Sequence, residues 1–216
     1  MASKYPDAEI IGIDLAPTQR PFHMKGNVTF RLADFNQDWD FPDDHFDLVH
    51  FRCLAGTAED WPGIYAEAYR CLKPGGWIEH TEIDLAVHAI KGRHVVPLPD
   101  DSAWDDWMMM LVETGKTTGR PFGLVGRHGI FNRIRGAGFI GAKERRQDLP
   151  IGRWAKEPRG KGLGARNEII MKTGVEGFML FGLKTILGSD DCDVDEVVGR
   201  VRQAVMRADF SLFQKM

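Results

Sequence analysis

The chain has 216 residues, of which 43% are hydrophobic and 27% are charged. These fractions are typical of a folded globular protein and exclude disorder as the overall state. The net charge of -3 disfavours nucleic acid as a partner, and the most basic stretch, Lys143–Arg146, is short enough to be a solvated face. The length fits one domain better than two.

The three cysteines, Cys53, Cys71 and Cys192, form no C-x-x-C pair. Their odd number indicates reduced thiols in an intracellular, cytoplasmic protein. We find no cluster with the spacing of a metal site, and we expect no metal. No apolar run approaches about 18 residues, so we expect no membrane span. The polar N-terminus has no apolar signal core.

The first 84 residues alternate between apolar runs and one helical pattern. Three short runs predict buried strands at Glu9–Asp14, Val28–Asp34 and Phe46–Phe51. Apolar residues at helical spacing predict a helix over Glu59–Leu72, which Lys73–Gly76 should end before a fourth strand over Trp77–Glu82. This alternation predicts an α/β fold with a mainly parallel sheet.

The rest of the chain reads as mostly helical, with a single strand from Ala137 to Arg146. The helical patterns cover Asp101–Gly115, Arg127–Gly136, Leu163–Leu187 and Asp193–Arg207. Gly174 and Gly177 are possible interruptions of the third helix, and Ala208–Met216 shows no clear strand pair. We divide the single domain into a sheet core (1–84), a helical cap region (85–135) and the remaining strand and helices (136–216).

Acidic residues follow two of the predicted strands. In open parallel sheets, ligands bind beyond the carboxyl ends of the strands. Asp14 could accept hydrogen bonds from a ribose, Asp34 could accept one from an exocyclic amine, and Phe35 offers a stacking face. Aspartate at a strand end is also a frequent turn former, and this alternative stays open.

Several motifs together resemble class I S-adenosylmethionine-dependent methyltransferases, in particular the fungal proteins related to the secondary-metabolism regulator LaeA. The motifs are Ile10–Pro17, Ala33–Phe35, Phe46–Arg52 and Leu72–Glu79, followed by Gly119–Phe122, Ala137–Phe139 and Leu149–Trp154. The resemblance covers about residues 4–190. It implies a Rossmann-like fold.

The resemblance also implies roles for single residues. It places Asp14 at the cofactor's ribose and Asp34 with Phe35 at its adenine. The region around Arg52 and Glu82 would border the methyl donor and the substrate. The helical stretch 101–118 would help to cover the acceptor pocket.

The sequence departs from this family at both ends. Members start one strand and one helix earlier, and that strand carries an acid-x-Gly-x-Gly-x-Gly turn, where bare backbone approaches the cofactor. This chain has no such motif, since Gly160–Ala165 (Gly-Lys-Gly-Leu-Gly-Ala) follows Pro158 rather than a strand. Because the first strand is the centre of the family's sheet, its neighbours should pair directly or a partner chain should supply it. The C-terminal hairpin of the family is expected to be lost or remodelled.

We therefore expect a truncated Rossmann-like scaffold that serves secondary metabolism as a cofactor-independent cyclase or isomerase of the pericyclase type, acting on a small hydrophobic intermediate. Orientation alone can supply several kcal/mol to such a reaction. The candidate pocket walls are Trp104, Trp107, Met108 and Trp154, and the candidate catalytic groups are His50, Arg52, Glu82 and His88.

Each of these candidates also has a structural interpretation. The Trp and Met stripe could be ordinary core, and His50 a satisfied core histidine. Arg52 could simply pair with Glu82 or Asp84.

Two other functions stay open. The chain could be an active O- or N-methyltransferase of a small molecule, with S-adenosylmethionine as cofactor and Glu82 or His88 as a base. It could instead be a non-catalytic interaction subunit. Under all three hypotheses we expect a homo-oligomer, because sheet edges left exposed favour pairing with another chain.

Overall fold

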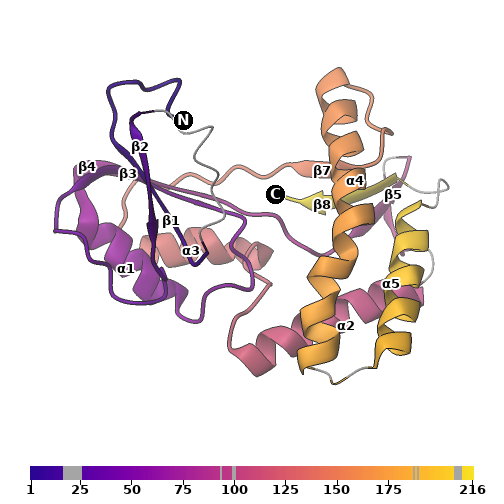
Figure 1. Cartoon of the computed structure of the whole chain (residues 1–216). Helices are drawn as coiled ribbons and strands as arrows, with labels where there is room; N and C mark the ends of the chain where they lie inside the picture. The colour runs from indigo at the N-terminus through magenta and orange to yellow at the C-terminus, as the bar shows by residue number, and fades with distance from the viewer. Residues whose placement is uncertain (17–25, 93, 99–100, 187, 189, 207–210) are drawn as a thin grey trace.

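The computed structural model describes residues 1–16, 26–92, 94–98, 101–186, 188, 190–206 and 211–216. The strands are β1 (Ile10–Asp14), β2 (Val28–Leu32), β3 (Phe46–Arg52), β4 (Leu72–Thr81), β5 (His88–Lys91), β6 (His94–Val96), β7 (Asp148–Ile151) and β8 (Ser211–Lys215). The helices are α1 (Trp61–Cys71), α2 (Asp101–Thr118), α3 (Gly129–Gly136), α4 (Pro158–Leu180) and α5 (Asp191–Met206). Figure 1 shows two parts side by side: β1–β4 with α1 and α3, and β5–β8 with α2, α4 and α5. No helix in the described ranges is long and apolar enough to cross a bilayer.

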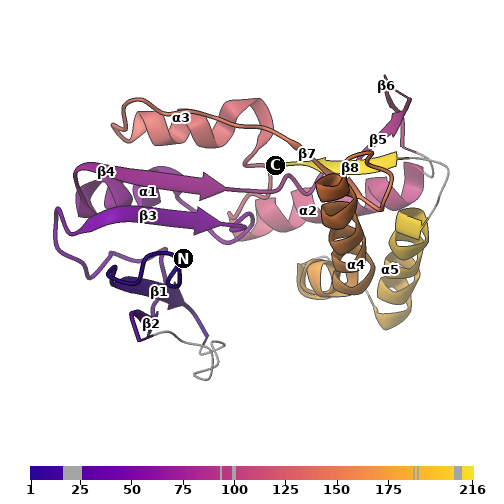
Figure 2. The same cartoon turned by 90° about the horizontal axis from the view of Figure 1, so that it is seen from above.

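The four strands of the first part form two separate parallel pairs. β1 pairs with β2, with Asp14 opposite Leu32, and β3 pairs with β4, with Arg52 opposite Thr81. Figure 2 shows the two pairs lying apart. We expected the two neighbours of the family's first strand to pair directly with each other. This expectation is wrong for the described residues. The supply of a strand by a partner chain stays a prediction.

Helix α1 covers the β3–β4 pair and follows the predicted pattern. Asp60 caps its first turn by accepting a hydrogen bond from the Gly63 N–H (3.1 Å), and Pro62 lies in that turn, where its missing N–H costs nothing. Its apolar face joins a small core that contains Phe51, Trp61, Ile64, Tyr65 and Leu124. Lys73–Gly76 does not separate the helix from the strand, because β4 begins directly at Leu72.

The second part holds an antiparallel sheet in the order β6-β5-β8-β7, which corrects two predictions. Half of the described strands pair antiparallel, so the molecule is not built on a mainly parallel sheet, and the described chain after residue 84 contains four strands rather than one. The C-terminal segment forms β8, in which Leu212 lies opposite both Ala89 of β5 and Ile151 of β7. Its partners are distant in sequence, so no local pattern signals the pairing.

The strand predicted from Ala137 to Arg146 does not form. Gly138 and Gly141 have φ of 103° and 67°, in a region incompatible with a regular strand. The segment instead crosses as a loop from α3 to β7, as Figure 1 shows. Regular pairing begins only at Asp148.

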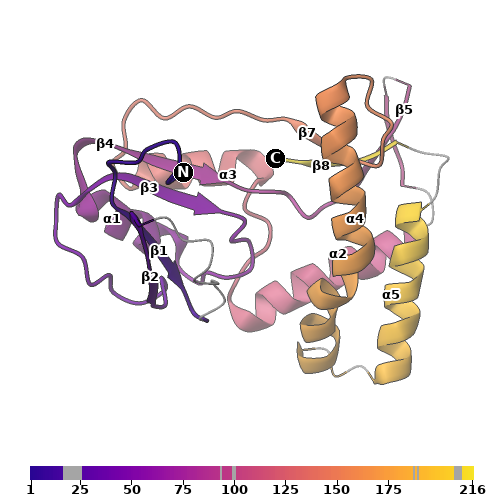
Figure 3. The ribbon, with the colours of Figure 1, turned by 45° about the horizontal axis from the view of Figure 1, so that its top comes forward.

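The helices of the second part pack against each other and on the antiparallel sheet (Figure 3). The prediction of α2 is confirmed, and α5 begins two residues before its predicted start. α4 runs without a break through Gly174 and Gly177 and continues as a π-helix over Phe181–Ile186. The predicted helix ends Leu187 and Arg207 lie outside the described residues.

Gly160–Ala165 belongs to α4 and not to a cofactor loop. Gly164 lies against the backbone of Gly152, where a Cβ atom would come within 2.0 Å of the Gly152 carbonyl oxygen. The Gly164 carbonyl also accepts the Gly152 N–H (3.0 Å). The helix and the end of β7 therefore meet through bare backbone.

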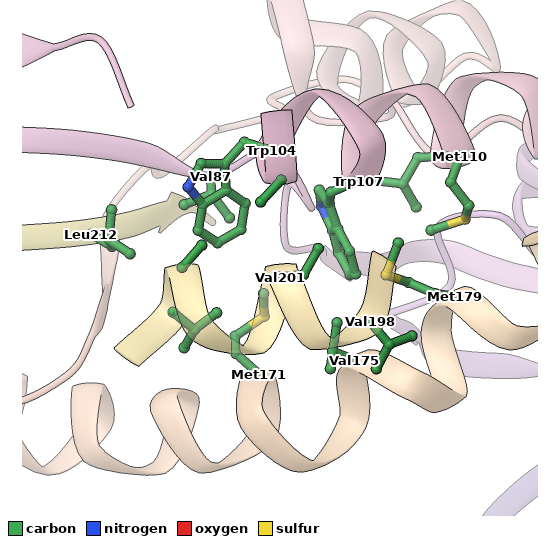
Figure 4. Close-up of a cluster of buried hydrophobic side chains, with 14 of the residues drawn as sticks. Val87, Trp104, Trp107, Met110, Met171, Val175, Met179, Val198, Val201 and Leu212 are labelled. Carbon is green, nitrogen blue, oxygen red and sulfur yellow. The ribbon is translucent and has the colours of Figure 1, made fainter. Parts of the chain in front are cut away.

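The main hydrophobic core lies between α2, α4, α5 and the antiparallel sheet. Trp104 and Trp107 are its largest members, with exposures of 2% and 0%. Figure 4 shows the Trp107 ring reaching from α2 toward α5, and its indole N–H donates to the Leu85 carbonyl (2.9 Å). Neither tryptophan lines the two grooves described below, and the helical periodicity of this stripe is explained by the core, the structural interpretation that the sequence left open.

Candidate functional site

Asp14 and Asp34 lie at the carboxyl ends of the adjacent strands β1 and β2. The Asp14 Oδ1 atom accepts the Ala16 N–H (3.1 Å), and the Asp34 Oδ1 atom accepts the backbone and side-chain N–H groups of Asn36 (both 2.9 Å). The backbone hydrogen bond from Asn36, followed by the side-chain one, holds the pKa of Asp34 below its usual value. Both residues therefore shape turns, as the structural interpretation predicted, and the Asp34 carboxylate stays ionised as an acceptor. We call these two carboxylates the acid edge.

The segment between β3 and α1, residues 53–60, connects the acid edge to the second part of the molecule. We call it the β3 loop. The Asn36 side-chain N–H donates to the Thr57 carbonyl (3.1 Å) on one side. On the other side, the Gly56 N–H donates to the Pro121 carbonyl (3.1 Å), and the Phe122 ring lies against Gly56. The loop thus contacts the turn after β2 through Asn36 and the segment after α2 through Pro121. No strand pairing joins these two segments directly.

The β3 loop begins at a strained residue that a buried acid supports. Cys53 has φ of 55°, a left-handed conformation that costs about 1 kcal/mol or more outside glycine. The following N–H, of Leu54, donates to Glu82 Oε2 (2.8 Å), while Glu82 Oε1 accepts the Ile83 N–H (2.9 Å). A hydrogen bond within a folded protein contributes about 0.5–1.5 kcal/mol, which is comparable with the strain. Glu82 is 5% exposed, so the predicted catalytic group is a buried partner of backbone groups.

Two further buried side chains extend this arrangement toward α1. The His80 Nε2 atom lies 3.5 Å from Glu82 Oε2, and the Tyr65 hydroxyl lies 2.7 Å from His80 Nδ1. Burial is the main cause that raises the pKa of the Tyr65 hydroxyl, so this group remains protonated. Sequence reasoning missed both residues, although His80 and Glu82 are two residues apart at the end of a strand and should face the same side.

An apolar groove of about 490 Å³ lies between α2 and the chain that follows β4. Met108, Leu111, Val112 and Phe122 supply apolar wall, and Asp84 and Lys116 add charged groups. We call it the α2 groove. Pro121, which accepts the hydrogen bond from the β3 loop, also lines it. Met108 lines this groove, and its role as a wall of a substrate pocket stays a prediction.

A second groove, of about 480 Å³, follows β4 and the loop that crosses to β7. Its walls mix apolar residues such as Ile78 and Ile134 with charged ones such as Arg145 and Arg159. It runs along β4 from Gly76 and reaches Glu82, just beyond the carboxyl end of that strand. The α2 groove contacts the β3 loop farther along, at Gly56, through Pro121 and Phe122.

The remaining candidates do not gather at this site. His50 is an exposed residue of β3, paired with Glu79 (3.0 Å), and not a core histidine. Arg52 is exposed and forms no ion pair with Glu82 or Asp84 among the described residues. Phe35 is half-buried, and its ring centroid lies 6.4 Å from that of Trp61.

Two further candidates contact the antiparallel sheet. His88 stacks on Phe213 within it, with ring centroids 5.3 Å apart. Trp154 is partly exposed and donates its indole N–H to the Leu212 carbonyl (2.8 Å). Both side chains therefore have structural contacts away from the acid edge. Among the described residues, no group of three or more side chains could hold a metal ion.

Comparison with known proteins places the chain in a family. A family model described as a methyltransferase domain matches residues 1–123, more than half of the chain. The secondary metabolism regulator LAE1 of Cochliobolus heterostrophus is 32% identical over 206 residues, which are 94% of this chain and 65% of that protein. The methyltransferase pytC of Aspergillus terreus is 32% identical over 211 residues, 97% of this chain and 62% of that protein. The chain thus spans less than two thirds of the length of these relatives.

The fold agrees with this assignment. The phosphoethanolamine N-methyltransferase 2 of Haemonchus contortus, solved with S-adenosyl-L-methionine, superposes with a TM-score of 0.51 at 18% identity, over 99% of this chain and 43% of that one. At this identity the likeness shows a shared Rossmann-like α/β fold alone. The chain therefore belongs to the class I S-adenosylmethionine-dependent methyltransferase family and is related to fungal LaeA-type regulators of secondary metabolism and to pytC.

Proposed function

We propose that this chain takes part in methyl transfer from S-adenosylmethionine to a small apolar acceptor. The carrying observation is the continuous connection from the acid edge, through the β3 loop, to the α2 groove. Membership of the methyltransferase family supports the same reaction. The relatives' names support methyl transfer and secondary metabolism, and none of them supports the cyclase that the sequence led us to expect.

The acid edge suits the adenosyl part of the cofactor. Ribose hydroxyls and the adenine amine are hydrogen-bond donors, and Asp14 and Asp34 place carboxylate acceptors at the ends of two adjacent parallel strands. Asp34 stays ionised because Asn36 donates to it. When bound, the cofactor supplies an electrophilic methyl group on a sulfonium.

The α2 groove suits a small apolar acceptor. Its apolar wall can bury most of such a molecule, while Asp84 and Lys116 can orient a polar substituent. The predicted bases do not serve here: Glu82 accepts two backbone N–H groups, and His88 lies in the antiparallel sheet. The chain's contribution to the reaction is therefore orientation, which can account for several kcal/mol of a barrier.

Calorimetric titration with S-adenosylmethionine tests the cofactor assignment. We expect binding by the wild-type chain, and about tenfold or more weaker binding by Asp14→Asn and Asp34→Asn, because each loses a charged acceptor. Asp38→Asn, an exposed acid near the same turn, is the matched control and should bind normally. Absence of any binding by the folded wild-type chain would overturn the proposal and favour a non-catalytic interaction subunit.

The acceptor groove is tested with 1-naphthol, a small apolar molecule with one hydroxyl, followed by its fluorescence. Met108→Glu should weaken its binding by about tenfold or more, because a charge enters an apolar wall. Met109→Glu is the control, since the neighbouring side chain is exposed and lies outside the groove lining. Equal affinities of the two variants would show that the probe binds elsewhere and would reject the groove.

A further inference from the structure

We propose that Glu82, held by His80 and Tyr65, is a positioning residue that sets the conformation of the β3 loop and so aligns the acid edge with the α2 groove. This inference deepens the proposed function and rests on it. Its physical content is a chain of contacts from Tyr65 of helix α1, through His80 of strand β4 and Glu82, to Leu54, the second residue after strand β3. The relevant groups all lie within the described part of the chain.

The chain of contacts has two links beyond the loop. The His80 Nε2 atom lies 3.5 Å from Glu82 Oε2, within ion-pair distance but without a hydrogen bond. The Tyr65 hydroxyl and His80 Nδ1 form a hydrogen bond of 2.7 Å. The side chains of His80 and Glu82 are 0% and 3% exposed, so water does not compete for these contacts. The buried imidazole therefore lies beside the same Glu82 oxygen that accepts the Leu54 N–H, so both contacts depend on one position of the carboxyl group.

The loop end of this chain is where the strand pairing stops. The Cys53 N–H still donates to the Thr81 carbonyl (3.0 Å), as the last hydrogen bond between the two strands. The Leu54 N–H turns away and finds Glu82 Oε2 instead. A shorter or displaced acceptor would leave this N–H without a partner, so the direction of the loop depends on where Glu82 stands.

The direction of the loop decides what lies at its far end. Only two residues separate Leu54 from Thr57, whose carbonyl accepts a hydrogen bond from the Asn36 side chain, which also donates to Asp34 of the acid edge. Gly56, between them, binds the Pro121 carbonyl at the α2 groove. Moving the start of the loop would therefore shift both contacts together. A substrate in the groove and a cofactor at the acid edge would lose their alignment without either touching Glu82.

Amide hydrogen exchange followed by NMR measures this role directly. In Glu82→Ala, the protection of the Leu54 amide should fall about tenfold or more, because its acceptor is removed. Amides of the β3–β4 pairing, including Cys53, should keep most of their protection. Glu82→Gln should restore part of the Leu54 protection, since the amide oxygen can still accept one N–H. Asp47→Asn, which alters only an exposed pair with Lys73 on the same strand, is the control.

The outcomes separate positioning from general stability. Unchanged protection of Leu54, or an equal loss at Leu54 and throughout the β3–β4 pairing, would overturn the inference. Should Glu82→Ala fail to fold, Tyr65→Phe decides, because it removes only the hydroxyl that holds His80. It should lower Leu54 protection selectively by about two- to threefold, and no selective change would overturn the inference.

A titration with S-adenosylmethionine links this inference to the proposed function while keeping the two distinguishable. Glu82→Ala should weaken cofactor binding although Glu82 directly follows strand β4 and does not belong to the acid edge. A selective loss of Leu54 protection with no cofactor binding by the wild-type chain would leave the positioning role standing and remove the proposed function. Normal cofactor affinity in a variant with an unprotected Leu54 would overturn the alignment role.

Discussion

The two parts of the molecule bury their side chains to very different extents. The core of the antiparallel part draws on three helices and three strands, and includes Trp104 and Trp107. The core of the parallel part is smaller and is built mainly around α1 and β3, and no residue of β1 or β2 belongs to the buried set. Large apolar side chains stay exposed on the parallel strands, with Leu32 at 70% and Trp77 at 73%.

This difference separates stability from the candidate site. The acid edge lies on the strand pair that contributes least to either core, and the α2 groove lies on a helix that packs into the main core. The β3 loop is the connection between them. Changes in the antiparallel core should therefore act on folding, and changes on β1 or β2 should act on binding or association.

The largest expected effect is on the antiparallel core. Trp107→Ala should lower the free energy of unfolding by about 3–5 kcal/mol, because it opens a cavity and leaves the Leu85 carbonyl without its indole partner. Chemical denaturation measures the change. Met109→Ala, at an exposed position of the same helix, should stay within about 0.5 kcal/mol. Similar losses in the two variants would contradict the assignment of the core.

A pH-dependent effect of intermediate size is expected at His88. Burial, followed by the charge of Lys215, lowers the pKa of this imidazole below its usual value of about 6.5. The unfolded chain then binds the proton more readily than the folded chain, so stability is complete above about pH 6.5 and decreases as the pH falls below it. His88→Gln should reduce this loss, measured as the free energy of unfolding between about pH 5 and 7. An unchanged pH slope in His88→Gln, with His94→Gln as control, would refute this account.

The smallest effect on folding is expected on the exposed parallel strands. Leu32→Ser and Trp77→Glu should change the free energy of unfolding by about 0.5 kcal/mol or less, because neither side chain is buried. Self-association, which stays a prediction from the sequence, would use such surfaces. Light scattering should then show a larger species for the wild-type chain than for Trp77→Glu. If light scattering shows that the wild-type chain is a monomer, the prediction of self-association is wrong.

The sequence predicted the local elements well and the long-range ones poorly. The four parallel strands and α1 follow from short apolar runs and an Asp-Trp-Pro helix start, which are local signals. Leu212 pairs with Ile151 and Ala89, which lie 61 and 123 positions earlier in the sequence, and no local pattern signals such pairing. The positive φ of Gly138 and Gly141 is incompatible with the strand that the sequence predicted there.

The same limit applies to the candidate site. The sequence identified Asp14, Asp34 and Glu82 as acids at strand ends. It could not show that Glu82 binds the Leu54 N–H, because that contact depends on how two strands end side by side.

The contact between Gly164 and Gly152 limits which amino-acid substitutions this chain can accept. Because a single methyl group at position 164 would overlap a carbonyl oxygen, any of the other nineteen amino acids must push α4 away from the end of β7. In a saturation library selected for folded protein, position 164 should remain glycine, whereas position 162, with open space around it, should accept many replacements.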